Sequence, residues 1–135
     1  FGEKDFQQLV IIKKIIKDLN LNIKVVTVKT VRDKYGLALS SRNKLLSTNQ
    51  LNIARKINYN LKKVNLYKGK SIVYLKKLLR RGLKNDGILN IEYLEIRSAS
   101  ELKKLKEISK NDTRLFIAVN IGNIRLIDNI KLKSN

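Results

Sequence analysis

The chain begins with an amphipathic segment in which apolar residues recur at steps of three and four. This spacing predicts a helix from Asp5 to Leu19, with Asp5 and Gln8 placed as a capping pair at its first turn. The stretch that follows, residues 23–28, has the β-branched density of a mostly buried strand. A helix that leads into such a strand is typical of an α/β layer.

The middle of the chain changes from an irregular stretch to helical patterns. Residues 29–46 show no sustained period, which predicts a long ordered loop or a junction between domains. Ser47 and Gln50 then form a capping signal in front of an amphipathic helix that we expect to end at Gly69. Ser71 starts a second amphipathic helix.

The last third of the chain carries strand patterns. Strands are expected over residues 91–97, 114–121 and 124–127, with a short helical connection over 100–108. Gly122-Asn123 is a two-residue hairpin signal between the last two strands. Helices followed by these strands indicate an α+β arrangement with a small, largely antiparallel sheet.

The composition fits one folded domain and excludes several kinds of site. The 135 residues are 43% hydrophobic, which is enough for a packed core. With no cysteine and no histidine, the sequence excludes disulfides, thiolate or imidazole metal ligands and a Ser-His triad. Its apolar runs are far shorter than the roughly 20 residues of a membrane helix, so we expect no membrane partner.

The chain is strongly basic, with a net charge of +19 from 30 Lys+Arg against 11 Asp+Glu. Such a charge raises nucleic acid as a partner, because neutralising phosphates releases counterions. The lysines, however, are scattered along the predicted helices, and the Lys-, Ile- and Asn-rich composition is typical of A/T-rich codons. We expect no specific nucleic-acid partner. A basic nucleic-acid-binding module and a non-functional remnant are the alternative interpretations.

Three polar clusters carry candidate chemistry. Gly2-Glu3-Lys4-Asp5 stands at the entrance to the first helix, where backbone amides and a lysine favour an anion. Gln7-Gln8 offers donors and acceptors for a hydroxy-acid substrate. Leu39-Ser40-Ser41-Arg42, just after Gly36, places paired hydroxyls beside a guanidinium, which suits a polyphosphate. On the residues alone, a helix cap, surface glutamines and ordinary turn chemistry explain the three clusters at least as well.

Together, the clusters resemble segments of the pantoate-β-alanine ligase family, in the same order and spacing. The resemblance runs over essentially the whole chain, and several motifs in register are far more specific than one short motif. Leu39 departs from the methionine that many family members have at this position, and Ile124 departs from a polar residue. The matching segments are residues 1–9, 30–33, 36–43 and 125–129.

The resemblance implies a fold in two parts. Residues 1–28 correspond to the C-terminal piece of a nucleotide-binding, Rossmann-like α/β domain. Residues 29–135 correspond to a small α+β lid domain with an antiparallel sheet, which carries the phosphate loop. The front half of the family, with its histidine motif, has no counterpart here, and the sequence opens at Phe1 without an initiator methionine. We therefore expect a fragment that starts at a cut and is inactive alone.

The resemblance also assigns roles to single residues. Gln8 corresponds to a contact with pantoate, while Asp5 and Lys4 correspond to contacts with the ribose and the phosphates of ATP. Residues 39–42 resemble the KMSKS phosphate loop of related nucleotidyl transferases, and Val31 corresponds to a backbone contact with adenine. The full set implied for ATP binding is Gly2, Glu3, Lys4, Asp5, Val31, Leu39, Ser40, Ser41 and Arg42.

By the same resemblance, the whole protein is a cytoplasmic, homodimeric ligase that makes pantothenate from pantoate and β-alanine. ATP activates the carboxylate of pantoate as an adenylate and releases pyrophosphate, and the amine of β-alanine then displaces AMP. Mg²⁺ is the implied cofactor, and the dimer contact is expected in the missing N-terminal half. No catalytic residue and no metal ligand is assigned within this chain.

Overall fold

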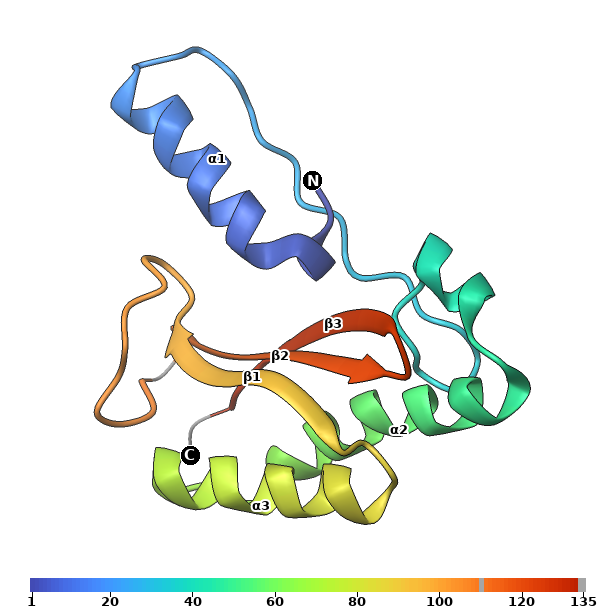
Figure 1. The fold of residues 1–135 in the computed structure, drawn as a ribbon. Coiled ribbons are helices and arrows are strands. Elements are labelled where there is room, and N and C mark those ends of the chain that lie inside the picture. The colour runs from blue at the N-terminus through green and yellow to red at the C-terminus, as the bar shows by residue number, and fades with distance from the viewer. Residues whose placement is uncertain (110, 134–135) are drawn as a thin grey trace.

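The computed structural model describes residues 1–109 and 111–133 (Figure 1). Three strands form an antiparallel sheet in the order β1-β2-β3, which confirms the predicted α+β arrangement. The elements in chain order are η1 (Glu3–Asp5), α1 (Phe6–Asp18), η2 (Ser41–Leu45), α2 (Thr48–Val64), α3 (Ile72–Asn85), β1 (Asn90–Ser98), β2 (Thr113–Ile121) and β3 (Ile124–Lys131), where η marks a 3-10 helix.

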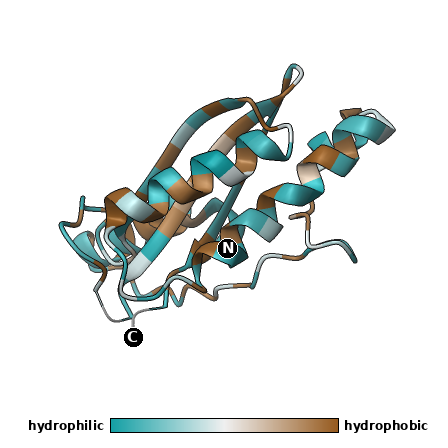
Figure 2. Ribbon diagram, turned by 90° about the horizontal axis from the view of Figure 1, so that it is seen from below, coloured by the Kyte–Doolittle hydropathy of each residue, from teal (hydrophilic) through white to brown (hydrophobic). Residues whose placement is uncertain are grey.

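The hydrophobic core lies between one face of the sheet and the pair α2 and α3 (Figure 1). Apolar and polar residues alternate along these helices and strands, as amphipathic elements require (Figure 2). The predicted caps at Ser47 and Ser71 are present, because each serine Oγ accepts a backbone N–H of the first helical turn. The buried apolar residues of the two helices are Ala54, Ile57, Leu61, Val64, Leu75, Leu79 and Leu83.

The predicted hairpin between β2 and β3 is confirmed, and β3 is longer than predicted. Gly122 has φ +57, a left-handed conformation that glycine adopts without steric cost. In this hairpin Asp128 pairs with Ile117, and Asn129 pairs with Phe116. Because successive side chains on a strand point to opposite faces, Asp128 shares the helix-covered face with Ile117, and Asn129 shares the other face with Phe116.

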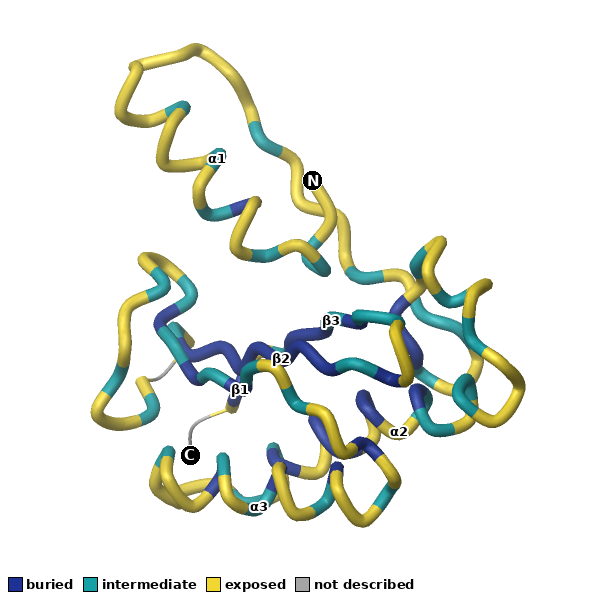
Figure 3. Tube along the Cα trace, viewed as in Figure 1, coloured by how far each residue is buried: buried dark blue, intermediate teal, exposed yellow. Residues whose placement is uncertain are grey.

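Helix α1 is attached to the second face of the sheet mainly through its first turn. The ring centroids of Phe6 and Phe116 lie 5.9 Å apart, and the Arg114 guanidinium lies 3.8 Å from the centroid of the Phe6 ring. Leu9 is the one buried residue of this helix. The rest of α1 and residues 21–28 are mostly exposed (Figure 3).

Residues 23–28 do not form the predicted strand. The one β-bridge of this extended segment joins Val28 to Gly2 in parallel. The Glu3 N–H donates to the Val28 carbonyl at 2.8 Å, and the Val28 N–H donates to the Phe1 carbonyl at 2.8 Å. A strand needs a continuous partner for its backbone groups, and the few residues in front of α1 are too short to provide one.

Three smaller predictions are also wrong. The Asp5 side chain makes no cap hydrogen bond, because a 3-10 turn leads directly into α1, so the capping pair with Gln8 does not exist. Residues 100–108 form turns and a bridge in place of a short helix, and Leu102 there has φ +58, which no helix accommodates. Helix α2 ends before Gly69 is reached.

The capping box of α2 can be tested with Ser47→Ala. Ser47 Oγ accepts the Gln50 N–H at 3.2 Å, and Gln50 Oε1 accepts the Ser47 N–H at 2.9 Å. We expect the substitution to lower the free energy of unfolding by about 1 kcal/mol, because the Gln50 N–H at the helix start loses its acceptor. Urea denaturation measures the change, with the exposed neighbour Thr48→Ala as the control. Wild-type stability in Ser47→Ala would contradict this expectation.

Candidate functional site

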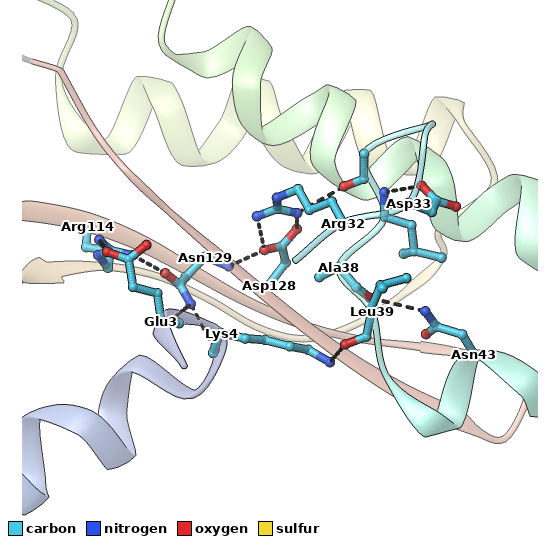
Figure 4. Close-up of polar contacts among 12 residues, drawn as sticks. Glu3, Lys4, Arg32, Asp33, Ala38, Leu39, Asn43, Arg114, Asp128 and Asn129 are labelled. Carbon is cyan, nitrogen blue, oxygen red and sulfur yellow. Dashed lines mark hydrogen bonds and ion pairs between the residues drawn. The ribbon is translucent and has the colours of Figure 1, made fainter. Parts of the chain in front are cut away.

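Two polar segments far apart in the sequence meet beside β3 (Figure 4). Lys4 Nζ donates a hydrogen bond to the Leu39 carbonyl at 3.0 Å. The Leu39 N–H in turn donates to the Val31 carbonyl at 2.9 Å. The fold therefore brings the first predicted cluster together with the start of the phosphate loop, and it places Val31 next to Leu39.

The backbone around Lys4 is held in place from the sheet. Asn129 Nδ2 donates to the Glu3 carbonyl and to the Lys4 carbonyl, each at 2.9 Å. Arg114 donates to Asn129 Oδ1, and its Nη2 lies 3.6 Å from the Glu3 carboxylate. Gly2, just in front, is fixed by its bridge to Val28. The Lys4 side chain thus projects from a backbone that has little freedom to move.

The residues that lead into the phosphate loop form a tight turn. Asp33 Oδ1 accepts the Leu37 N–H at 2.8 Å, and Arg32 Nη1 donates to the Gly36 carbonyl at 3.0 Å. Gly36 has φ +90, and a Cβ at this position would lie 3.0 Å from Asn58 Oδ1. The predicted loop is therefore ordered, and its glycine is needed for backbone conformation and for close packing on α2.

The phosphate loop itself presents its polar atoms near the surface. Ser40 Oγ accepts the Arg42 N–H at 3.3 Å where η2 begins. Arg42 Nη1 donates to the Arg125 carbonyl on β3 at 3.3 Å. Ser41 and Arg42 are exposed and Ser40 is half-buried, so hydroxyl and guanidinium donors are accessible to a ligand.

A cavity of about 170 Å³ lies where η1 and the first turn of α1 face the sheet. Of the predicted site residues, Lys4, Asp5 and Gln8 line it, whereas residues 39–42 do not. Lys4 is therefore the link between the cavity and the phosphate loop. The lining residues are Lys4, Asp5, Phe6, Gln7, Gln8, Tyr93, Phe116, Ile127, Asp128 and Asn129.

The other cavity residues were not assigned to the site from the sequence, among them Tyr93, Phe116 and Asn129. Tyr93 and Phe116 belong to strand patterns in which an aromatic residue indicates only burial. Burial raises the pKa of Tyr93 above 10.0, so its phenol is neutral at neutral pH and is a donor and acceptor. For Asn129 a signal existed, because two adjacent polar residues, Asp128 and Asn129, stand between the apolar residues of this strand.

Charges of both signs surround Lys4. Burial lowers the pKa of Lys4 below 10.5, and the guanidinium groups of Arg42 and Arg32 act in the same direction. Asp5 and Asp128 oppose this effect. An anion placed beside Lys4 and Arg42 would relieve the mutual repulsion of the two cations, which is the property expected of a phosphate site.

Metal ligands and membrane-spanning helices were considered as further features of the described residues. Within residues 1–109 and 111–133, no group of three or more His, Cys, Asp or Glu side chains could hold a metal ion. In the same part of the chain, no helix is both long enough and apolar enough to cross a membrane. The donors of Lys4 and Arg42 suit a polyanion bound next to a small cavity with mixed polar and aromatic walls.

The conformation of the loop can be tested with Gly36→Ala. We expect a loss of about 1–3 kcal/mol in the free energy of unfolding, because alanine is strained at positive φ and its Cβ crowds Asn58. Gly2→Ala is the matched control, since Gly2 has φ −78 and nothing lies within 4 Å of an added Cβ. Chemical denaturation of both variants measures the difference. Equal losses in the two variants would refute the role given to Gly36.

Known proteins match this chain along nearly its whole length. A family model described as Pantoate-beta-alanine ligase matches residues 1–131. The pantothenate synthetase of Carboxydothermus hydrogenoformans is 40% identical over 141 residues, which cover 98% of this chain and 48% of that protein. The pantothenate synthetase of Flavobacterium psychrophilum is 39% identical over 135 residues, with coverage of 98% and 48%. The chain thus spans about half the length of the curated relatives it matches.

Solved structures match as well. The crystal structure of pantothenate synthetase from Thermus thermophilus superposes with a TM-score of 0.90 at 32% identity, covering 98% of this chain and 49% of that one. A pantoate-β-alanine ligase from Francisella tularensis, complexed with beta-gamma ATP and beta-alanine, gives a TM-score of 0.68 at 32% identity, with coverage of 96% and 41%. Sequence and fold therefore identify the same group of proteins.

Proposed function

Since the chain belongs to the pantoate-β-alanine ligase family, we propose that it forms the C-terminal part of an ATP-dependent ligase that condenses pantoate with β-alanine. The carboxylate of pantoate attacks the α-phosphate of ATP, which forms pantoyl adenylate and releases pyrophosphate. The amine of β-alanine then attacks the acyl carbon and releases AMP. The Francisella tularensis relative, described in complex with beta-gamma ATP and beta-alanine, supports these substrates.

The contact between Lys4 and the phosphate loop carries this proposal. Lys4 Nζ lies 3.0 Å from the Leu39 carbonyl although the two residues are 35 positions apart in the sequence. Lys4 and Gln8 both line the cavity described above. Lys4 therefore lies between a pocket of suitable size for a small hydroxy acid and a loop rich in hydrogen-bond donors for phosphate. The bond between the hydroxy acid and the nucleotide would form at this place.

The residues of the phosphate loop have a distinct role in this scheme. Negative charge builds on the leaving pyrophosphate as its bond to the α-phosphate breaks. Lys4, Arg42 and the hydroxyls of Ser40 and Ser41 are accessible donors that can stabilise this charge. Leu39 contributes its backbone, and its carbonyl is the group that ATP phosphates would displace from Lys4.

The remaining site residues contact the other parts of the substrates. Gln8 binds pantoate through its amide, and Asp5 accepts hydrogen bonds from the ribose hydroxyls of ATP. Gly2 and Glu3 contribute backbone groups in the same turn, where no side chain crowds Gly2. Val31 contacts adenine through its backbone, which is supported by its direct hydrogen bond to Leu39.

Mg²⁺ fits this site as an ion that arrives with ATP. Magnesium prefers oxygen ligands and keeps several waters when it binds together with nucleotide phosphates. Asp128 is occupied by Arg32 at 2.7 Å, and no carboxylate cage exists among the described residues. We therefore assign its ligands to phosphate oxygens and water, where the ion would neutralise charge on the pyrophosphate.

The proposal includes a division of the chain. Residues 1–28 belong to a Rossmann-like nucleotide-binding domain, and residues 29–135 form the lid. The exposed apolar side chains of α1 and the next segment support this division, because they need a partner that the described residues do not supply. A homodimer through the N-terminal half, and a cytoplasmic location, are parts of the same proposal. The exposed apolar residues in question are Ile11, Ile15, Leu19, Leu21, Ile23, Val26 and Val28.

The purified chain alone should release no AMP from ATP, pantoate and β-alanine, because half of the proposed enzyme is absent. A fusion that joins this chain to the N-terminal half of the Carboxydothermus hydrogenoformans relative should release AMP only when all three substrates are present. Omission of each substrate in turn is the control. A folded fusion without activity would overturn the proposal, whereas AMP release by the chain alone would refute only the expectation that this part is inactive by itself.

The role of Lys4 can be tested in the active fusion with Lys4→Met, which keeps an unbranched side chain, one atom shorter, and removes its charge. We expect kcat to fall about 10²- to 10³-fold, because a donor to the developing pyrophosphate charge is lost. Lys62→Met, an exposed position on α2, is the matched control and should keep wild-type kcat. Steady-state AMP release measures both, and a wild-type kcat in Lys4→Met would remove Lys4 from the mechanism.

A further inference from the structure

Two adjacent residues of β3, Asp128 and Asn129, each hold one of the two segments that form the ATP site (Figure 4). Both are almost fully buried, with 4% of each exposed. They project to opposite faces of the sheet, because successive side chains on a strand alternate. One strand can therefore reach the start of the chain from one face and the loop before Leu39 from the other.

Asn129 uses all of its side-chain groups to hold the segment that carries Lys4. Its Nδ2 donates to the carbonyls of Glu3 and Lys4 at 2.9 Å each, and its Oδ1 accepts from Arg114. Both amide hydrogens point at consecutive backbone carbonyls, so the direction of the chain at Lys4 is fixed. Strand β3 therefore fixes the position of the backbone from which the Lys4 side chain extends.

Asp128 holds the other segment through Arg32. Its two carboxylate oxygens accept from Arg32 Nη1 and Nη2 at 2.7 and 2.8 Å, a bidentate pair with only 20% and 3% of the two side chains exposed. Arg32 Nη1 also donates to the Gly36 carbonyl, which ties the pair to the turn that precedes the phosphate loop. Asp128 Oδ1 further accepts the Asn129 N–H at 2.8 Å, so the two residues are coupled.

We propose that Asp128 and Asn129 are positioning residues that set the distance between Lys4 and the phosphate loop, so that both act on the same ATP phosphates. The identity of the ligand rests on the proposed function, whereas the geometric content of the proposal does not depend on it. Neither side chain is given a contact with the reacting atoms. An error of about 1 Å in such a distance can cost about 10²-fold in rate.

Residue-resolved hydrogen exchange by NMR on the chain itself tests the geometry without any activity. In Asn129→Asp, which keeps the shape and the acceptor but places a carboxylate against two carbonyls, the amides of Glu3 and Val28 should exchange about tenfold faster or more. In Asp128→Asn, which weakens the pair with Arg32, the amides of Leu37 and Leu39 should exchange faster instead. Amides of β1 and β2 should keep their protection in both variants.

Two matched controls carry the same chemical changes elsewhere. Asn123→Asp alters an exposed amide in the hairpin at the start of the same strand. Glu92→Gln weakens the exposed bidentate pair between Glu92 and Arg125, which has distances of 2.7 and 3.0 Å. Neither control should change exchange at Glu3, Val28, Leu37 or Leu39.

Pantoate-dependent exchange of pyrophosphate into ATP by the active fusion tests the consequence. Asn129→Asp and Asp128→Asn should each lower kcat about 10²-fold at temperatures where β1 and β2 remain protected, and the two controls should keep wild-type kcat. Uniformly faster amide exchange over the whole sheet would overturn the proposal, because it indicates a general loss of stability. Normal kcat despite locally faster exchange would also overturn it. An inactive wild-type fusion with the local exchange pattern intact would count against the proposed function alone.

Discussion

The free edge of β3 is the constraint on which the rest of this site depends. Within the part of the chain that the structure describes, strand β3 pairs with β2 on one side only, so its outer backbone groups need partners from elsewhere. Arg42 donates to the Arg125 carbonyl at 3.3 Å, and Asn65 donates to the Lys131 carbonyl at 3.2 Å. Side chains from segments distant in the sequence therefore satisfy this edge, and one of them, Arg42, belongs to the candidate site.

The ion pair between Arg32 and Asp128 on β3 matters more for the geometry of the candidate site than for stability. A buried ion pair such as Arg32–Asp128 is weak support for stability, because removing both charges from water costs about as much as their attraction returns. Its value lies in geometry, since a bidentate pair fixes both distance and orientation. The fold thus contains a costly buried ion pair at the point where the two segments of the candidate site meet.

Local patterns were reliable wherever an element packs against a continuous partner. The helices that begin after Ser47 and Ser71 were predicted with their caps, because capping and amphipathic spacing are properties of a few neighbouring residues. The segment 23–28 has an equally clear strand pattern but forms a single bridge. The pattern predicts a buried strand, but the described residues provide no neighbouring strand to pair with it. A strand is stable only when neighbouring strands pair with its backbone.

The sequence by itself determined the kinds of chemistry available and the segments that are candidates for the site. Without histidine or cysteine, the candidate chemistry is that of lysine, arginine, serine and amide groups, and the family resemblance named Lys4, Gln8 and residues 39–42 as candidates. Only the tertiary structure decided that Lys4 contacts Leu39. It also decided that Asp128 binds Arg32 and that Asn129 binds the backbone of Glu3. The physical reason is that those contacts cross between 35 and 126 residues of chain, where no local spacing records which side chains will meet.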